Sequence, residues 1–354
     1  MTYAVIMAGG SGTRYWPKSR KSLPKHLIQF GEMGVLLERT VERLAPFFPK
    51  ERIFVITTRE QEAICRKYLA MLPPDNLICE PLGMDSAPCV ALSAAIISRI
   101  DPDAVISMFP ADHLIYPEDA FLRTISRACE HAKSGKYLVT LGINPDRPAI
   151  EYGYIGRGFL LDPGVFTVRE FREKPTAAIA EKLISSGEYY WNCGIFTWRA
   201  SKILSEIARF LPNTHERVMR IADNWGKPEF ASTFANEYPS ADKISIDYAV
   251  MEKTSDAIVV QAEFTWDDVG TWLSLQRHCS QDVNGNIIIG NVSALDASNS
   301  IISGETDRLV AVLGVKDMII VDTGDALLVM PKSESHRIKE LLEKLKKEGL
   351  QRYL

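Results

Sequence analysis

Short apolar runs alternate with amphipathic stretches through the first 142 residues. Apolar runs predict buried strands over residues 3–7, 52–58, 76–80, 104–109 and 137–142. The stretches between them predict helices over 60–71, 87–100 and 118–132, with Pro88 near a helix start, where its missing N–H is tolerated. This alternation implies a parallel or mostly parallel sheet with helices on both faces. Ligands of such sheets bind beyond the carboxyl ends of the strands.

The pattern changes twice after residue 142. Residues 166–171 alternate as in an antiparallel strand, and 176–186 and 200–210 have helical character. From about residue 284, short β-prone runs over 286–290, 300–303, 309–312, 318–321 and 326–329 predict a small β-solenoid or sandwich. Ile338, Leu341, Leu342 and Leu345 then follow at helical spacing, with Gly349 as a C-cap, which favours a packing or dimer-contact helix. We predict domains over 1–280 and 281–354.

Composition and charge narrow the class of protein. The chain has 354 residues, 46% of them hydrophobic and 24% charged, as in ordinary soluble globular proteins. Its 41 basic and 45 acidic residues give a net charge of −4, which does not support nucleic-acid binding. No apolar run approaches the roughly 20 residues that span a membrane. We see no signal peptide, and the six cysteines are scattered without a zinc-type pair, so we expect reduced thiols and a cytoplasmic protein.

The turn after the first strand carries the strongest chemical signal. Three glycines in four positions let the backbone adopt positive φ and approach a ligand closely, in the run Ala8-Gly9-Gly10-Ser11-Gly12-Thr13-Arg14. Successive N–H groups in such a turn form a concave anion site, and Arg14 and Lys25 add cations near it. The stretch therefore predicts a polyphosphate site, with a tight turn that binds nothing as the alternative.

Two familiar phosphate motifs do not fit this turn. A P-loop is excluded because no Gly-Lys-Ser/Thr closes it. The dinucleotide fingerprint is excluded because Tyr15 stands where its third glycine should be.

Carboxylates from distant parts of the chain are candidate metal ligands. Asp112 follows a predicted buried strand, and Asp267 and Asp268 lie in a turn-rich segment between two tryptophans. Mg²⁺ in phosphate-binding sites takes only one or two protein carboxylates and keeps several waters. Each aspartate alone is more typical of a turn or a cap. Combined with a phosphate-binding turn, the metal interpretation is favoured.

Two further motifs suit a sugar phosphate. Glu173 and Lys174 come at a strand end, where they are either a solvated ion pair or ligands for sugar hydroxyls and a second phosphate. Asn192 lies among aromatic residues, where it either binds hydroxyls beside rings that pack on a sugar or is a satisfied core residue.

The order of these motifs resembles that of the sugar-1-phosphate nucleotidyltransferases and, within them, most closely the mannose-1-phosphate guanylyltransferases (GDP-mannose pyrophosphorylases). The resemblance covers nearly the whole chain. It runs through Gly9–Arg14 with Pro17, Pro24 and Lys25, then Glu80-Pro81-x-Gly83, Ala87-Pro88, Pro110-x-Asp112-His113, Tyr152–Ile155, Glu173-Lys174-Pro175, Trp191–Phe196, Ile244–Lys253 and Trp266-x-Asp268-Val269-Gly270.

This resemblance implies a fold, a reaction and a set of roles. The fold would be a mixed, mostly parallel Rossmann-like α/β nucleotidyltransferase sheet followed by a short β-helix and a terminal helix. The reaction would convert GTP and mannose 1-phosphate to GDP-mannose and pyrophosphate with Mg²⁺, in a cytoplasmic homodimer. The implied sites are Arg14 and Lys25 for catalysis; Ala8, Gly9, Gly10, Gly12, Thr13, Asp85, Ser86 and Pro88 for the nucleotide; Gly153, Glu173, Lys174 and Asn192 for the sugar phosphate; and Asp112 and Asp268 for the metal.

The chain departs from the family pattern in two places. The family commonly carries a basic residue, Asn and Thr before Ala-Pro, where this chain has Met84-Asp85-Ser86. We hypothesise that Asp85 accepts hydrogen bonds from N1–H and N2–H₂ of guanine. The family also commonly reads Glu-Thr-Gly before Tyr-Gly-Tyr, where this chain has Ala149-Ile150-Glu151. The alternatives are therefore the same chemistry with another nucleotide or hexose 1-phosphate, or a regulator that binds nucleotide sugars without turnover.

Overall fold

A nine-stranded mixed sheet carries the functional loops. The computed structural model describes residues 1–10, 12–29, 34–304 and 306–354, so Ser11 of the glycine turn lies outside the described residues. The strand order is β3-β2-β1-β4-β9-β6-β10-β8-β7, and β8 and β9 run opposite to the other strands. The bounds are β1 Thr2–Met7, β2 Ile53–Thr58, β3 Leu77–Glu80, β4 Val105–Pro110, β6 Leu138–Ile143, β7 Gly153–Asp162, β8 Val165–Arg172, β9 Tyr189–Arg199 and β10 Ala257–Gln261.

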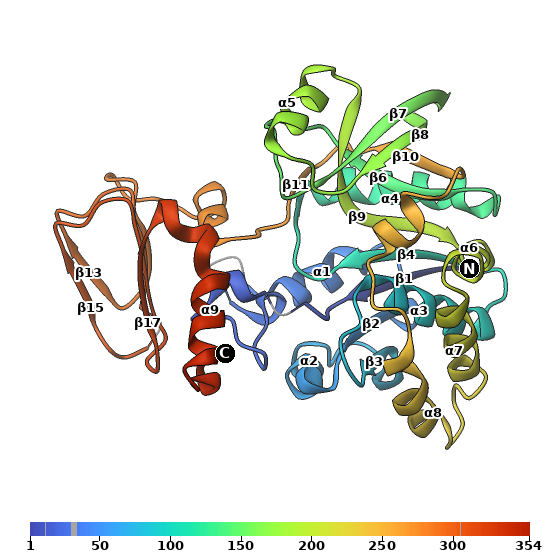
Figure 1. The fold of residues 1–354 in the computed structure, drawn as a ribbon, viewed down its shortest axis with the longest axis horizontal. Coiled ribbons are helices and arrows are strands. Elements are labelled where there is room, and N and C mark those ends of the chain that lie inside the picture. The colour runs from blue at the N-terminus through green and yellow to red at the C-terminus, as the bar shows by residue number, and fades with distance from the viewer. Residues whose placement is uncertain (11, 30–33, 305) are drawn as a thin grey trace.

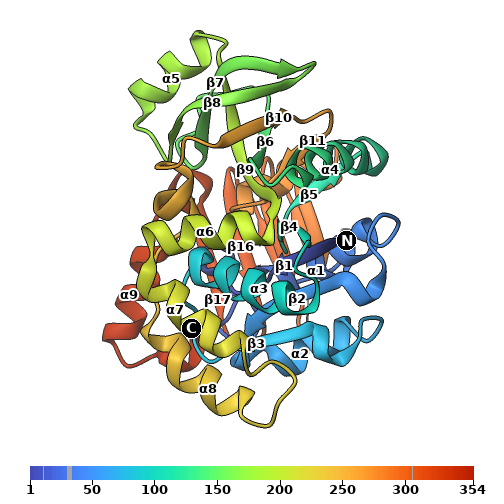
Figure 2. The ribbon, with the colours of Figure 1, turned by 90° about the vertical axis from the view of Figure 1, so that its right-hand side faces the viewer.

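Helices cover both faces of this sheet, as the alternation predicted. Side chains point alternately to the two faces of a strand, so Ala4 and Ile6 of β1 join one buried cluster while Tyr3 and Val5 join the other. The first face packs against α1 Leu36–Leu44, α2 Glu62–Tyr68 and α4 Glu118–Lys133. The opposite face packs against α3 Ser86–Ile100, α6 Ala200–Phe210, α7 Pro212–Ala222 and α8 Phe230–Glu237 (Figures 1 and 2).

Some elements differ from the sequence prediction. The helix expected over 60–71 is shorter, because α2 spans only Glu62–Tyr68 after a single 3₁₀ turn. A small antiparallel pair, β5 Leu114–Tyr116 with β11 Thr265–Asp267, was not predicted, nor were α1, α7 and α8. The expected helix over 176–186 is present as α5 Ala177–Ser185.

The last strands coil into a short β-helix. β12 Ile287–Gly290, β14 Ile301–Gly304 and β16 Met318–Asp322 stack in parallel, as do β13 Val292–Leu295 and β15 Val310–Leu313. β17 Leu327–Pro331 closes the stack by pairing antiparallel to β16. Ile287, Ile301 and Ile319 occupy equivalent positions of successive turns and are buried together. Because these strands stack in parallel, the segment is the solenoid and not the sandwich, the two folds that the sequence pattern left open. The domain boundary after residue 280 stays a prediction.

Helix α9, Ile338–Lys347, brings the chain back to the N-terminal segment (Figure 1). Ile338 is buried in one cluster with Tyr15 and Trp16. The Trp16 indole N–H donates to the Tyr353 carbonyl at 2.7 Å, and Gly349 follows the helix with φ of 77°. The apolar stripe of α9 is therefore a packing surface. Among the described residues, none of the helices combines the length and apolar character required to cross a membrane.

Candidate active site

Loops at the carboxyl ends of β1, β3 and β4 border two pockets. The first, the Asp112–Asp268 pocket, has a volume of about 300 Å³ and is lined by Gly12, Thr13, Arg14, Lys25, Asp112, His113, Asp268, Gly270 and Lys339. The second, the Glu80–Asp85 pocket, has a volume of about 240 Å³ and is lined by Met7, Gly9, Gly10, Ile56, Glu80, Gly83, Met84, Asp85, Ser86, Cys89 and Pro110. The glycine turn borders both pockets, as expected for loops that follow parallel strands.

The glycine turn packs tightly against Lys25. Gly12 has φ of 58°, and a Cβ at this position would lie only 2.3 Å from the Lys25 Cβ, so only glycine fits. The Lys25 side chain is buried, and its ammonium donates to Asp112 Oδ2 at 2.6 Å and to the Asp268 carbonyl. The Arg14 guanidinium lies beside Gly270, whose carbonyl it contacts at 3.4 Å. The two predicted cations therefore share one pocket with the two predicted metal ligands.

The pairing of β5 with β11 brings Asp112 and Asp268 together. Asp267 is in register with Leu114, so the residue after β11 and the residues before β5 lie at the same end of this pair. Burial favours the neutral form of Asp112, but the charges of Lys25 and His113 and the hydrogen bond from Lys25 together outweigh it and lower the carboxyl pKa to about 2. Asp268 accepts from the Tyr152 hydroxyl at 2.8 Å and from the Gly270 N–H at 3.1 Å, both through Oδ1. No hydrogen bond reaches its Oδ2 within the described part of the chain.

The neighbouring carboxylate, Asp267, is fully engaged in the fold. It accepts from the Arg277 guanidinium at 2.5 and 2.9 Å, and from the Val269 N–H at 2.8 Å. The His278 ring nitrogen Nε2 lies 2.7 Å from Asp267 Oδ2. Although burial opposes ionisation, these partners hold the Asp267 pKa well below its ordinary range. Of the two adjacent aspartates, only Asp268 lines the pocket.

The Glu80–Asp85 pocket contains part of the predicted nucleotide set. Asp85 is exposed, has φ of 70°, and accepts the Ser86 N–H at 2.9 Å as the cap of α3. The Ser86 hydroxyl accepts from the Ile246 N–H at 2.9 Å, which ties this loop to the 244–246 segment. Pro88 and Ala8 are buried beside the pockets and line neither, and the Ala8 N–H donates to the Ile56 carbonyl.

Glu80 is a pocket residue for which the sequence indicated no role. Its side chain is 4% exposed, and a Cβ on Gly9 would lie 3.4 Å from its Oε2. Burial raises the Glu80 pKa to about 7, and the hydrogen bond donated by the Tyr238 hydroxyl offsets this only in part. The sequence feature that could have identified Glu80 is its position as a carboxylate at the end of a buried strand. Its partner Tyr238 is 158 residues away, which no local pattern reveals.

The four predicted sugar-phosphate residues form one cluster. Gly153 is paired with Asn192 between β7 and β9, and a Cβ on Gly153 would lie 2.5 Å from Glu173 Oε2. Lys174 donates to Glu173 Oε1 at 2.6 Å, and Glu173 Oε2 is buried without a hydrogen-bond partner. Such an oxygen is suited to accept from a ligand hydroxyl, because a buried acceptor left unpaired is costly.

Asp247 also belongs to this cluster and was missed. Asn192 donates its amide N–H to Asp247 Oδ1 at 2.9 Å. Burial, followed by the nearby charge of Glu173, raises the Asp247 pKa to about 6. The 244–253 segment contributed to the resemblance, but its sequence did not indicate that one of its carboxylates faces Asn192.

Tyr152 joins the sugar-phosphate cluster to the Asp112–Asp268 pocket. It precedes Gly153 and donates its hydroxyl to Asp268. Its ring centroid lies 5.1 Å from that of Trp191 and 4.8 Å from that of Trp266. The Arg147 guanidinium lies 5.4 Å from the centre of the Tyr152 ring. A pocket lined by cations and two carboxylates thus adjoins the predicted sugar-phosphate cluster, an arrangement suited to joining two phosphorylated substrates.

Comparison with known proteins places these features in context. Residues 3–284 match the nucleotidyl transferase family, and residues 290–345 match the MannoseP isomerase/GMP-like β-helix domain. The chain is 38% identical over 361 residues to a mannose-1-phosphate guanylyltransferase of Klebsiella pneumoniae, covering 100% of this chain and 76% of that protein. It is 36% identical over 360 residues to a mannose-1-phosphate guanylyltransferase of Escherichia coli K12, covering 98% and 74%.

Solved structures agree with the fold. A crystal structure described as a mannose-1-phosphate geranyltransferase from Thermus thermophilus is 36% identical, with a TM-score of 0.87 over 98% of this chain and 99% of that one. A crystal structure described as a mannose-6-phosphate isomerase from Helicobacter pylori is 23% identical, with a TM-score of 0.60 over 75% of this chain and 99% of that one, and shows the fold alone.

Proposed function

The chain belongs to the nucleotidyl transferase family and, within it, to the mannose-1-phosphate guanylyltransferases, and we propose that it transfers GMP from GTP to mannose 1-phosphate. The products are GDP-mannose and pyrophosphate. The observation that supports this most directly is that Arg14, Lys25, Asp112 and Asp268 line a single pocket. A pocket that combines these cations with two carboxylates suits a triphosphate with a divalent metal better than it suits a neutral ligand.

The proposed chemistry needs no general base. The phosphate oxygen of the sugar substrate is already an anion, and like charge opposes its attack on the α-phosphorus. The bond that forms joins this oxygen to the α-phosphorus, and the bond that breaks releases pyrophosphate. Arg14 and Lys25 would align the triphosphate and stabilise the charge that builds on the departing group. Lys25 is held for this task by its contact with Asp112.

The pocket fits a divalent metal, which we propose to be Mg²⁺. Asp112 and Asp268 would hold it, since both line the pocket and Asp268 Oδ2 carries no hydrogen bond from the described residues. Across the described ranges there is no group of three or more His, Cys, Asp or Glu side chains placed to bind a metal. Two carboxylates completed by substrate phosphates and water are the usual pattern for Mg²⁺. When bound, the ion would screen the phosphate charges.

The sugar-phosphate cluster supplies a testable role for Glu173. We expect Glu173→Ala to raise the KM for mannose 1-phosphate by about 10- to 100-fold, because a charged acceptor for sugar hydroxyls is worth roughly 1.5–3 kcal/mol. The KM for GTP should change little. Steady-state kinetics with each substrate varied in turn measures both. The matched control is Glu170→Ala, which removes a carboxylate of β8, the strand just before Glu173, that pairs with Arg172. Equal KM shifts for both substrates, or none, would contradict the role.

The carboxylates of Glu80 and Asp85 line one pocket and are candidates for recognising the guanine base. We expect Asp85→Ala to lose the preference for GTP over ATP, because guanine N1–H and N2–H₂ are donors that a carboxylate accepts. The measurement is the ratio of kcat/KM for GTP to that for ATP. An unchanged ratio in Asp85→Ala would refute the role of Asp85.

A role for Glu80 makes a separate prediction about pH. Since its pKa is raised to about 7, Glu80 is protonated below that pH and ionised above it. An ionised carboxylate accepts both guanine donors, so the preference for GTP should rise as pH increases through about 7. Glu80→Gln should flatten this dependence while keeping an acceptor for Tyr238. A preference that depends on pH equally in both proteins would contradict the role.

The homodimer and the cytoplasmic location stay predictions from the sequence. Light scattering of the purified full chain measures the oligomeric state directly.

A further inference from the structure

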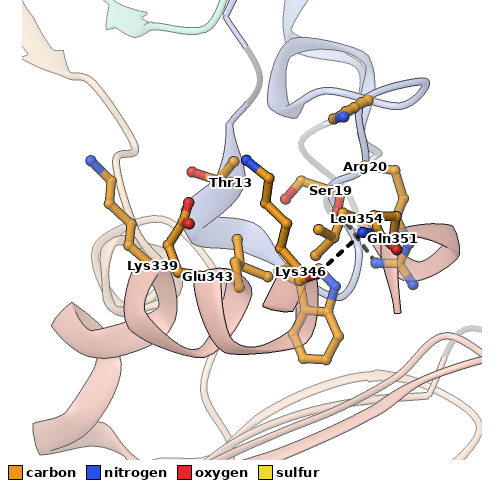
Figure 3. A pocket seen from close by; sticks show the side chains of 11 residues that line it. Thr13, Ser19, Arg20, Lys339, Glu343, Lys346, Gln351 and Leu354 are labelled. Carbon is orange, nitrogen blue, oxygen red and sulfur yellow. Dashed lines mark hydrogen bonds between the residues drawn. The ribbon is translucent and has the colours of Figure 1, made fainter. Parts of the chain in front are cut away.

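The terminal helix α9 places a lysine at the Asp112–Asp268 pocket. Lys339 lines this pocket together with Arg14 and Lys25, although it comes from the opposite end of the sequence. Lys339 and Thr13 also line an adjoining pocket of about 310 Å³ between α9 and the 13–21 segment. Figure 3 shows Lys339 extending from one end of α9 and Thr13 on the segment that faces this helix, with Lys346 reaching toward Thr13. The helix that follows the β-helix therefore contributes to the wall of the site that faces the proposed triphosphate.

The position of α9 is fixed by buried contacts close to Lys339. The preceding residue, Ile338, is 2% exposed and packs in the cluster of Tyr15 and Trp16. Trp16 donates to the Tyr353 carbonyl at 2.7 Å, and the Trp272 indole donates to the Trp16 carbonyl at 3.2 Å. The packing of Ile338 ties α9 itself to the chain directly after the glycine turn, the Tyr353 contact ties the segment after α9 to the same place, and Trp272 holds Trp16 there. The backbone of Lys339 is thus held at the pocket while its long side chain remains exposed.

The charge of Lys339 has no partner among the described residues. Among the residues that the structure describes, no hydrogen bond or ion pair engages its ammonium, whereas Lys25 is bound to Asp112 and Glu340 to Arg337. A triphosphate carries several negative charges within a short distance, and the two carboxylates of the pocket add more. A third cation at the pocket would lower this repulsion.

We propose that Lys339 is a substrate-binding residue, which contacts phosphate oxygens of the nucleotide and of the pyrophosphate it releases. This inference rests on the proposed function, because it assumes that the pocket receives a triphosphate. It makes α9 part of the substrate site in addition to its packing role. Lys339 adds an electrostatic contact to the phosphates and no proton transfer.

The test compares four full-length proteins: wild type, Lys339→Ala, Lys339→Arg and Lys344→Ala. Lys344 is the matched control, because it is an exposed lysine of the same helix that faces the groove beside β17. Titration calorimetry with inorganic tripolyphosphate and Mg²⁺ measures affinity without requiring turnover. We expect Lys339→Ala to bind about tenfold more weakly, the lower end for a contact to a charged group because the side chain is exposed. Lys339→Arg should recover most of the affinity, and Lys344→Ala should match the wild type.

Kinetics provide the second measurement. Lys339→Ala should raise the KM for GTP about tenfold and leave the KM for mannose 1-phosphate unchanged, with a loss that shrinks as salt increases. Equal affinities in Lys339→Ala and the wild type, or equal losses in Lys339→Ala and Lys344→Ala, would overturn the inference. A wild type that binds tripolyphosphate through Lys339 but releases no pyrophosphate would instead overturn the proposed function and leave the role of Lys339 in phosphate binding intact.

Discussion

Asp268→Asn is expected to lose turnover by a factor of about 10²–10³ or more and to keep its fold. Asparagine removes the negative charge that would hold the metal, and losing a comparable electrostatic contact in an active site costs roughly 3 kcal/mol. Its side-chain oxygen can still accept from Tyr152 and Gly270, the two donors that Asp268 binds through Oδ1. Folding should therefore be preserved. Pyrophosphate release at saturating Mg²⁺ measures turnover, and thermal unfolding measures stability.

The adjacent residue provides the matched control. Asp267→Asn removes a carboxylate that pairs with Arg277 and His278 and does not line the pocket. It should destabilise the protein by about 2 kcal/mol, because it removes the charge of a buried carboxylate that pairs with Arg277 and with the largely buried His278 side chain, and it should keep most of the turnover of the folded protein. Near-normal turnover of Asp268→Asn at saturating Mg²⁺ would rule out its metal role. Equal losses of turnover in both variants would show that the segment acts only through the fold.

Arg14→Met is expected to lower kcat by a factor of about 10²–10³, or roughly 3 kcal/mol, because it removes a cation that we propose contacts the triphosphate. Among the described residues, the hydrogen bond of the Arg14 side chain is a long contact of 3.4 Å to the Gly270 carbonyl, so methionine of similar length should leave the local fold intact. The measurement is pre-steady-state pyrophosphate release, which separates chemistry from product release.

Two further variants distinguish the effect of the Arg14 charge from an effect on the fold. Arg14→Lys keeps the charge and should retain part of the rate, although it lacks the planar donors of arginine. Arg20→Met changes an arginine of the same segment that pairs with Asp325, and it should keep nearly the wild-type rate. If Arg14→Met turned over as fast as Arg20→Met, Arg14 would have no role in the reaction of the triphosphate.

Local pattern was enough to predict six of the nine strands of the sheet, but not β7, β9 or β10. Strands β1 to β4 and β6 are buried apolar runs between helices, so a continuous stretch of apolar residues identifies each of them in the sequence. Strand β9 lies between β4 and β6 and antiparallel to both, after the chain has passed through β7, β8 and α5. Only tertiary pairing decides that position. Strand β13 was missed because its residues are mostly exposed and its backbone pairing to β15 gives no apolar signal.

Some residues of the candidate site could likewise be found from the sequence, and others could not. Arg14, Lys25, Asp112 and Asp268 could be proposed from the glycine turn, from carboxylates in turns and from the family resemblance, and the structure brings them to one pocket. Glu80, Asp247 and Lys339 were missed because their importance depends on partners far along the chain. Glu80 is bonded to Tyr238, Asp247 to Asn192, and Lys339 reaches the pocket only because α9 packs on Trp16.

The proposed reaction is best tested by pyrophosphate release from the purified full chain with Mg²⁺, crossing four nucleoside triphosphates with mannose, glucose and other hexose 1-phosphates. We expect clear preference for GTP with mannose 1-phosphate. Preference for another pair would contradict the assigned substrates and move attention to Met84-Asp85-Ser86 and Ala149-Ile150-Glu151. No release with any pair, from folded protein that still binds GTP, would contradict the enzymatic function itself.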